Sequence, residues 1–245
     1  MLAGKFHDGS GIGNQLHRYV FTRVKALDLG VPFGMLGKFK GDSFMELDKG
    51  EVVVNPEQML YFEETRINND QGVDIRPYDI LTEGLVDNTI VDGEFQDEKY
   101  WKHRENEVRE WLKTETLFLP DDLCVINFRG GEYVGVKDLF LTQDYWDLAI
   151  TEMKKINPDM KFVVHTDDPE TARQFFPYEC VHSVGINWRA IRYAKYVILS
   201  NSSFGILPAL LNENAEKIIA PMYHAGRNVG YWKMAQNKYE KFTYL

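Results

Sequence analysis

The C-terminal half of the chain alternates short apolar runs with segments whose apolar residues recur at helical spacing. The apolar runs predict buried strands at residues 123–128, 161–165, 179–184, 196–200 and 217–221. The periodic segments predict helices from Thr142 to about Ile156, over residues 168–176, over 187–195 and over 203–212. This alternation predicts a parallel sheet with helices on both faces.

The N-terminal half carries a weaker pattern. An apolar stripe predicts a helix over residues 13–29, and residues 97–113 predict a second, strongly amphipathic helix. Strands are predicted over 30–36 and 51–55, whereas residues 1–8 (MLAGKFHD) lack the pattern of a buried strand. We therefore expect an α/β protein of two Rossmann-like lobes, residues 1–117 and 118–245, with a cleft between them.

The composition is that of an ordinary soluble protein, with 44% hydrophobic and 27% charged residues. A formal net charge of −9 argues against broad nucleic-acid binding, which requires a basic surface. Because no apolar run is long enough to cross a membrane and residues 1–9 lack the apolar core of a signal peptide, we expect a cytoplasmic protein. Cys124 and Cys180 stand in apolar runs without metal-binding spacing, which favours buried, reduced thiols over a disulfide.

Three of the predicted strands end in residues suited to a nucleotide diphosphate, and ligands of open α/β sheets bind beyond the carboxyl ends of the strands. Arg129 with Gly130-Gly131 follows one strand, Asp167-Asp168 follows the next, and residues 201–204 (NSSF) open a helix after a third. An arginine forks onto phosphate oxygens, and glycines let backbone amides face the same anion. Hydroxyls and amides at a helix N-terminus also bind phosphate.

Each of these segments also has a simpler structural interpretation. Arg129 would otherwise lie in a surface turn, Asp168 would cap a helix, and one serine would serve as an N-cap. Asp167 is not needed as a cap and can accept hydrogen bonds from a ribose or a base. The set requires no metal, and the sequence has no HExxH, DxD or Cys/His cluster, although TDD at residues 166–168 leaves a divalent cation as a minor alternative.

The glycine-rich stretch at residues 9–14 (GSGIGN) partly imitates the dinucleotide fingerprint GxGxxG, with Asp28 at a suitable spacing for a ribose contact. The last glycine of the fingerprint is replaced by Asn14, and the segment before it is a poor strand. A dinucleotide-dependent oxidoreductase is therefore the less favoured interpretation.

Five short segments occur in order over about residues 10–212. They are SGIGNQLHRY (10–19), VDGEFQDEKYW (91–101), INFRGGEY (126–133), HTDDPETA (165–172) and LSNSSFGILPALL (199–211). In turn they resemble GGLGNQ, GYWQSEKYF, HIRRGDY, SDDP or TDDP, and SNSTFSWWAAWL of the α-1,2-fucosyltransferases, glycosyltransferase family 11. The HIRRGDY motif is shared with α-1,6- and protein O-fucosyltransferases, the wider group that uses GDP-fucose.

The resemblance implies a fold of the GT-B type that moves a sugar, L-fucose, from a GDP-sugar to a glycan hydroxyl with inversion. It implies no required metal or other cofactor, and an N-terminal lobe on the acceptor side. By position, Arg129 would bind the donor's β-phosphate and stabilise the departing GDP. The other donor-binding positions would be Gly13, Asn14, Asn127, Asp167, Asp168, Ser202, Ser203 and Phe204.

The chain departs from the family pattern at several of these positions. Asn127 replaces the family histidine, Gly130 the second arginine and Glu132 the aspartate, while Ile206-Leu207 replaces the tryptophan pair. These changes keep open a catalytically lapsed protein that only binds a nucleotide sugar or a glycan.

An inverting transfer needs a base that takes the proton of the acceptor hydroxyl. Glu132, His17 and Asp8 are the candidates, although Glu132 also suits an ion pair with a nearby arginine and His17 a position facing solvent. Arg18 and Arg23 are candidates for replacing the positive charge of the missing arginine.

Overall fold

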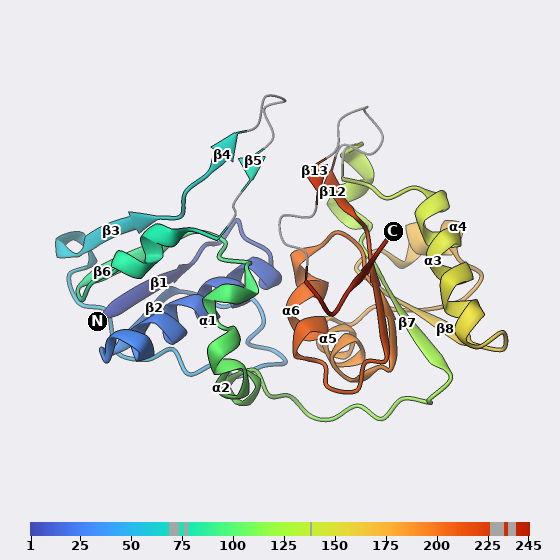
Figure 1. Ribbon diagram of the computed structural model, residues 1–245, viewed down its shortest axis with the longest axis horizontal. Helices are drawn as coiled ribbons and strands as arrows, with labels where there is room; N and C mark the ends of the chain where they lie inside the picture. The colour runs from blue at the N-terminus through green and yellow to red at the C-terminus, as the bar shows by residue number, and fades with distance from the viewer. Residues whose placement is uncertain (69–73, 76–77, 138, 226–232, 235–238) are drawn as a thin grey trace. The chain divides into compact units, whose positions relative to one another are not determined.

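The computed structural model describes residues 1–68, 74–75, 78–137, 139–225, 233–234 and 239–245. The chain forms two compact units, Met1–Lys113 and Thr114–Leu245 (Figure 1). This division falls a few residues before the boundary that the sequence predicted at residues 117–118. Each unit is built on a parallel sheet, and the α/β class predicted from the sequence is confirmed.

The first unit contains a four-stranded sheet in the order β2-β1-β6-β3, in which every pair is parallel. Its strands are β1 (Leu2–Phe6), β2 (Phe33–Gly37), β3 (Leu60–Glu63) and β6 (Thr89–Asp92). The helix α1 (Ile12–Leu29) connects β1 to β2 and packs against both. Among the residues described in this unit, the remaining elements are an antiparallel pair, four short 3-10 helices and one short α-helix: β4 (Ile67–Asn68), β5 (Asp74–Ile75), Pro56–Gln58, Ile80–Gly84, Glu98–Tyr100, Lys102–Arg104 and α2 (Glu105–Trp111).

The strand β1 corrects the sequence prediction for residues 1–8. It is an internal strand of the sheet, and its residues Leu2 and Phe6 are buried. Its apolar pattern is interrupted by Gly4, where an added Cβ would lie 2.4 Å from Thr22 Oγ1 of α1. The glycine is needed because α1 packs closely against β1 at this point.

Two other predictions for this unit are wrong. Residues 51–55 form no strand, because pairing with β2 stops after the bridge between Gly34 and Gly50 and the hydrogen bond from Glu51 N to Phe33 O at 2.8 Å. Val52, just beyond this pairing, is 84% exposed. Residues 97–113 are not one helix, because two 3-10 turns precede α2. At the break, Trp101 has φ −137° and ψ −7°, outside the helical region, and its side chain is fully buried.

The second unit contains a six-stranded sheet in the order β14-β11-β10-β7-β8-β9, again entirely parallel. Its strands are β7 (Leu123–Phe128), β8 (Lys161–Thr166), β9 (Glu179–Val181), β10 (Tyr196–Ile198), β11 (Lys217–Ala220) and β14 (Thr243–Tyr244). Its other elements, within the part that the structure describes, are a 3-10 helix, four α-helices and an antiparallel pair: Gly131–Gly135, α3 (Gln143–Ile156), α4 (Pro169–Phe175), α5 (Val184–Tyr193), α6 (Ser203–Leu211), β12 (Tyr223–Ala225) and β13 (Lys233–Met234).

The strands and helices predicted for this half are present, with α3 and α4 on one side of the sheet and α5 and α6 on the other (Figure 1). Asp168 caps α4 as predicted, because its side chain accepts from Thr171 N at 3.0 Å. Thr142 occupies the N-cap position of α3 without making a capping hydrogen bond. Both cysteines are free thiols, with Cys124 buried and Cys180 half-buried.

Within the described residues, no helix combines the length and the apolar character needed to cross a bilayer.

Candidate functional site

The sheet of the second unit reverses its strand order beside β7. The chain proceeds from β7 through β8 to β9 on one side, and then places β10 and β11 on the other side. In open α/β sheets, ligands bind at the carboxyl ends of the two strands that flank such a switch point. Arg129 directly follows β7, and residues 199–202 connect β10 to α6.

Arg129 lies between two carboxylates. One terminal nitrogen of its guanidinium pairs with Asp167 Oδ2, and the other donates to Glu132 Oε1 at 2.8 Å. The guanidinium carbon lies 5.3 Å from the ring centre of Tyr133. The side chain is 30% exposed, although its Nε is buried and makes no hydrogen bond with any described residue. Arg129 is therefore held in place by its neighbours and still reaches solvent.

The two aspartates after β8 bind the loop that follows β7. Asp167 Oδ1 accepts from Gly130 N at 2.9 Å, and Asp168 Oδ2 accepts from Gly131 N at 3.2 Å. The expectation that these two amides face a bound anion is wrong, because both donate to carboxylates of the chain itself. Hydrogen bonds from Thr171, with that from Gly131, hold the pKa of Asp168 below its ordinary value.

The close approach of the two loops explains the glycines. A Cβ on Gly130 would lie 2.7 Å from Asp168 Cβ, and Gly131 has a φ of +46° in the left-handed region. Both positions therefore require glycine for this loop to exist. Within the part of the chain that the structure describes, no group of three or more His, Cys, Asp and Glu side chains is arranged to hold a metal ion.

Asn127 lies beneath the first turn of α6. It is 5% exposed, and its Oδ1 accepts from Ser200 Oγ at 3.2 Å. A Cβ on Gly205 of α6 would lie 2.7 Å from the same oxygen. In this structure Asn127 therefore supports the turn into α6 and does not present its side chain to solvent.

The three residues at the start of α6 have different surroundings. Ser202 is buried and caps the helix, with its Oγ accepting from Phe204 N at 3.4 Å. Ser203 is half-buried, and its hydroxyl makes no hydrogen bond with any described residue. The ring of Phe204 packs edge-on against Trp188. The helix thus offers a hydroxyl and its N-terminal dipole at the strand end next to Arg129.

In the first unit, Asn14 binds a loop of the same unit. Its Nδ2 donates to Glu94 Oε1 at 3.3 Å, and its Oδ1 accepts from Gln96 Nε2 at 3.0 Å. Gly13 is buried within α1. Asn14, predicted as donor-binding, thus lies where α1 meets the segment after β6.

The neighbouring Gln15 joins the loops that follow β1 and β2. Its fully buried amide donates to the carbonyls of His7 at 3.1 Å and Lys38 at 3.4 Å, and accepts from Lys40 N at 2.9 Å. The glutamine of the GNQ motif therefore fixes two strand ends relative to each other.

His17 does not face solvent, contrary to the sequence interpretation. Its side chain is fully buried, and neither ring nitrogen makes a hydrogen bond with any described residue. Burial lowers its pKa to about 3. The assignment of His17 as a catalytic base is wrong for this structure, because a substrate hydroxyl does not reach a buried nitrogen.

Arg18 and Arg23 are both used inside the first unit. Arg18 is buried and donates to the carbonyls of Gly93 at 2.7 Å and Lys5 at 2.9 Å. Arg23 pairs with Asp48 at 3.2 Å. The suggestion that they supply positive charge to a donor phosphate is therefore not supported.

Asp28 does not fit the dinucleotide interpretation. An acid that binds a ribose has to lie near the glycine loop that binds the pyrophosphate. Asp28 instead lies in the last turn of α1, at the opposite end of an 18-residue helix, where it pairs with Arg104 at 2.6 Å and His103 at 3.0 Å.

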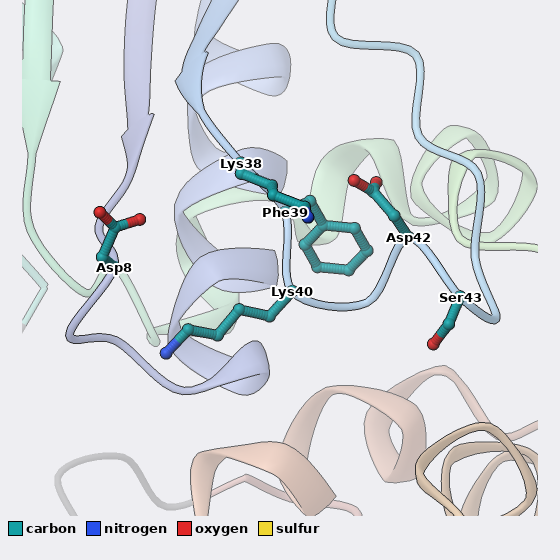
Figure 2. A pocket seen from close by; sticks show the side chains of 6 residues that line it. All are labelled: Asp8, Lys38, Phe39, Lys40, Asp42 and Ser43. Atoms are coloured by element: carbon teal, nitrogen blue, oxygen red, sulfur yellow. The ribbon is translucent and has the colours of Figure 1, made fainter.

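A pocket of about 430 Å³ lies at the carboxyl ends of β1 and β2, lined by Asp8, Lys38, Phe39, Lys40, Asp42 and Ser43 (Figure 2). Lys40 extends toward the side of the pocket that carries Asp8 (Figure 2). Asp42 pairs with Lys49 at 3.4 Å, whereas no ion pair among the described residues involves Asp8, Lys38 or Lys40. The charged groups of this pocket and the Ser43 hydroxyl suit a ligand rich in hydroxyl or acidic groups.

The sequence interpretation missed His7, which follows β1 directly. Its Nε2 lies 2.9 Å from Asp92 Oδ1, at the end of β6. A histidine one residue after a strand is a recognisable signal, but β1 itself was not recognised as a strand.

Comparison with known proteins identifies the fold. No protein-family model matches the chain, and no curated protein matches it in sequence. Among solved structures, the crystal structure of NodZ α-1,6-fucosyltransferase soaked with GDP-fucose is similar, with a TM-score of 0.51 and 13% sequence identity. The similarity covers 89% of this chain and 93% of that chain. The chain therefore has a mixed α/β fold with parallel sheets, similar to the fold of that fucosyltransferase.

Proposed function

We propose that the protein is a metal-independent glycosyltransferase that moves L-fucose from GDP-fucose to a hydroxyl of a glycan, with inversion at the anomeric carbon. The observation that carries this proposal is the position of Arg129. It is an accessible cation at the switch point of the second sheet, in a fold shared with a fucosyltransferase.

The surroundings of Arg129 suit a diphosphate. The strands β7 and β10 are adjacent and in register at Ile126 and Ile198, so Arg129 and the N-terminus of α6 follow neighbouring strand ends. A guanidinium and a helix N-terminus together supply the positive charge that a metal ion supplies in other nucleotide-sugar sites.

The chemistry asked of Arg129 is stabilisation of the leaving group. As the acceptor oxygen bonds to the anomeric carbon, the bond from that carbon to the β-phosphate oxygen breaks, and GDP leaves with the electron pair. A bound phosphate has to share or replace the carboxylate contacts of Arg129. Glu132 is 74% exposed, so its ion pair is weak and gives way at small cost.

The acceptor is proposed to bind the first unit. The pocket beside Asp8, with Lys38, Lys40 and Ser43, offers both donors and acceptors of the kind that hold sugar hydroxyls. This proposal rests on the same fold similarity and on the position of the pocket at strand ends.

The proposal is tested by ligand-induced stabilisation and by turnover. GDP and GDP-fucose are expected to raise the melting temperature, whereas ADP, UDP and NAD⁺ at the same concentration are not. Added oligosaccharides are expected to stimulate GDP release from GDP-fucose. Stabilisation by NAD⁺ without stabilisation by GDP would overturn the proposal in favour of an oxidoreductase.

A second candidate function is binding of a nucleotide sugar without turnover. It is favoured by Gly130, which stands where the resemblance places a second arginine, and by the two carboxylates that share Arg129. GDP binding without any acceptor-stimulated GDP release would select this alternative.

A further inference from the structure

The sheet of the first unit also has a switch point. The chain passes from β1 to β2 on one side of β1. The later strands β3 and β6 lie on the other side, where β6 pairs with β1. The carboxyl ends of β1 and β6 are therefore the ligand-binding position that this topology predicts. His7 follows β1, and Asp92 is the last residue of β6.

His7 and Asp92 form a hydrogen-bonded pair across these two strand ends. His7 Nε2 lies 2.9 Å from Asp92 Oδ1, and Tyr61 donates its hydroxyl hydrogen to Asp92 Oδ2 at 2.8 Å. The buried Arg18 lies 3.5 Å from Asp92 Oδ1. Because a carboxylate only accepts, the Nε2 of His7 carries the hydrogen, and the lone pair of the neutral ring lies on Nδ1.

The backbone of His7 is also held by hydrogen bonds. Its carbonyl accepts from Ser10 N at 3.0 Å and from the buried Gln15 Nε2 at 3.1 Å. The side chain is 33% exposed, and within the described part of the chain nothing hydrogen-bonds to Nδ1. The next residue, Asp8, lines the pocket that we assign to the acceptor.

We infer that His7 is the general base of the transfer reaction, oriented by Asp92, and that the acceptor hydroxyl binds at the carboxyl ends of β1 and β6. This inference rests on the proposed function. His7 Nδ1 takes the proton of the acceptor hydroxyl while that oxygen bonds to the anomeric carbon and GDP leaves with the electron pair of the broken bond. The imidazolium then returns its proton to solvent.

The groups around His7 suit this role. Burial favours the neutral acid of Asp92, but hydrogen bonds from His7 and Tyr61 and the charge of Arg18 hold its pKa below the ordinary value. Burial and the Asp92 carboxylate raise the pKa of Tyr61 to about 12, so Tyr61 remains a hydrogen-bond donor at neutral pH. Asp92 therefore stays ionised and stabilises the imidazolium that forms when Nδ1 is protonated. A further carboxylate, that of Asp8, belongs to the residue that follows His7 in the sequence.

The decisive variant is His7→Gln, because the glutamine amide can still donate to Asp92 but has no basic nitrogen. The matched control is His103→Gln. His103 is a more exposed histidine of the same unit, and it too pairs with an aspartate, Asp28. Each protein is assayed for fucose transfer from GDP-fucose to a panel of labelled oligosaccharides, for GDP affinity by calorimetry and for melting temperature.

We expect His7→Gln to lower kcat by at least 100-fold with GDP affinity and melting temperature unchanged, and His103→Gln to transfer at the wild-type rate. Asp92→Asn acts through His7 and is expected to lower kcat by a smaller factor.

The possible failures are distinguishable. A wild type that binds no GDP and transfers no sugar overturns the proposed function, and GDP binding without transfer selects the binding-only alternative; either result also overturns the inference. Wild-type rates in His7→Gln overturn the inference alone. Loss of transfer in Asp8→Asn with normal His7→Gln rates would assign the base to Asp8.

Discussion

An ion pair between Arg129 and Asp167 connects the ends of β7 and β8, two adjacent strands of the second sheet. Asp167 also accepts from Gly130 N at 2.9 Å, so one carboxylate orients both the guanidinium and the backbone that follows it. The guanidinium of Arg129 is thus held in position before any anion binds, which lowers the entropic cost of binding an anion.

Arg129→Ala is expected to weaken GDP binding by at least tenfold, because charge-assisted hydrogen bonds contribute about 1.5–3 kcal/mol each. The free energy of unfolding should change little, since the ion pairs that are lost are partly exposed. Calorimetric titration with GDP and urea unfolding measure the two effects.

The matched control is Lys195→Ala. It removes the same charge from the same unit at the amino end of β10, where Lys195 pairs with Asp121 and Glu216. An unchanged GDP affinity in Arg129→Ala, or an equal loss in Lys195→Ala, would contradict the assignment of Arg129 to the donor site.

Glu132→Gln is expected to strengthen GDP binding. The carboxylate lies 2.8 Å from the guanidinium and competes with a phosphate for it, and an exposed pair of this kind is worth about 0.2–1 kcal/mol. The affinity should therefore rise by a factor of about 1.5 to 5. Glu115→Gln is the control, because it removes another exposed carboxylate partner from a different arginine of the unit, Arg189.

The same variant separates two roles of Glu132. If this residue only pairs with Arg129, transfer in Glu132→Gln should continue at saturating donor. A large fall in kcat together with tighter GDP binding would make Glu132 the base and would argue against His7.

The sequence predicts an element where its stabilising contacts are local. Asp168, Pro169 and Thr171 lie within one turn, so the start of α4 is readable from the chain alone. The same holds for Arg129, whose position follows from the apolar run that ends at Phe128. The α/β class and the strand-end position of the candidate donor site were predictable for this reason.

The sequence does not reveal features that depend on distant contacts. Gly4 makes β1 look like a poor strand, yet the reason for the glycine is Thr22 on the next helix. His7 and Asp92 are separated by 85 residues and meet only because β1 and β6 are neighbours in the sheet. Asp167 binds Arg129 for the same kind of reason, and no local pattern shows that pairing.

Asp168→Ala is expected to lower the free energy of unfolding by about 1 kcal/mol, the typical cost of losing an N-cap. It should also weaken GDP binding, because Asp168 holds Gly131 N beside Arg129. The pKa of Asp168 lies below its ordinary value, so its stabilising contribution is present at neutral pH and is lost as the pH falls below about 4.

Urea unfolding at pH 7 measures the loss, and Asp144→Ala is the control. Asp144 is an exposed acid in the first turn of α3 and is not the cap of that helix. A change of only a few tenths of a kcal/mol is expected for it. Equal losses in the two variants would contradict a capping role for Asp168.

His17→Leu is expected to remove a pH dependence of folding. Burial lowers the pKa of His17 to about 3, whereas an unfolded histidine titrates near 6.5. Between these values the unfolded state binds more protons than the folded state, so acid favours unfolding. For this residue alone, the free energy of unfolding should fall by about 2 kcal/mol between pH 7 and pH 5.

At pH 7.5 the leucine variant should be at least as stable as wild type, because it replaces two buried nitrogens that make no hydrogen bond with any described residue. The measurement is the difference in unfolding free energy between variant and wild type, taken at several pH values so that the other titrating groups cancel. This difference should grow in favour of the variant as the pH falls from 7 to 5. A difference for His17→Leu that stays constant with pH would mean that His17 reaches solvent, and would restore it as a candidate base.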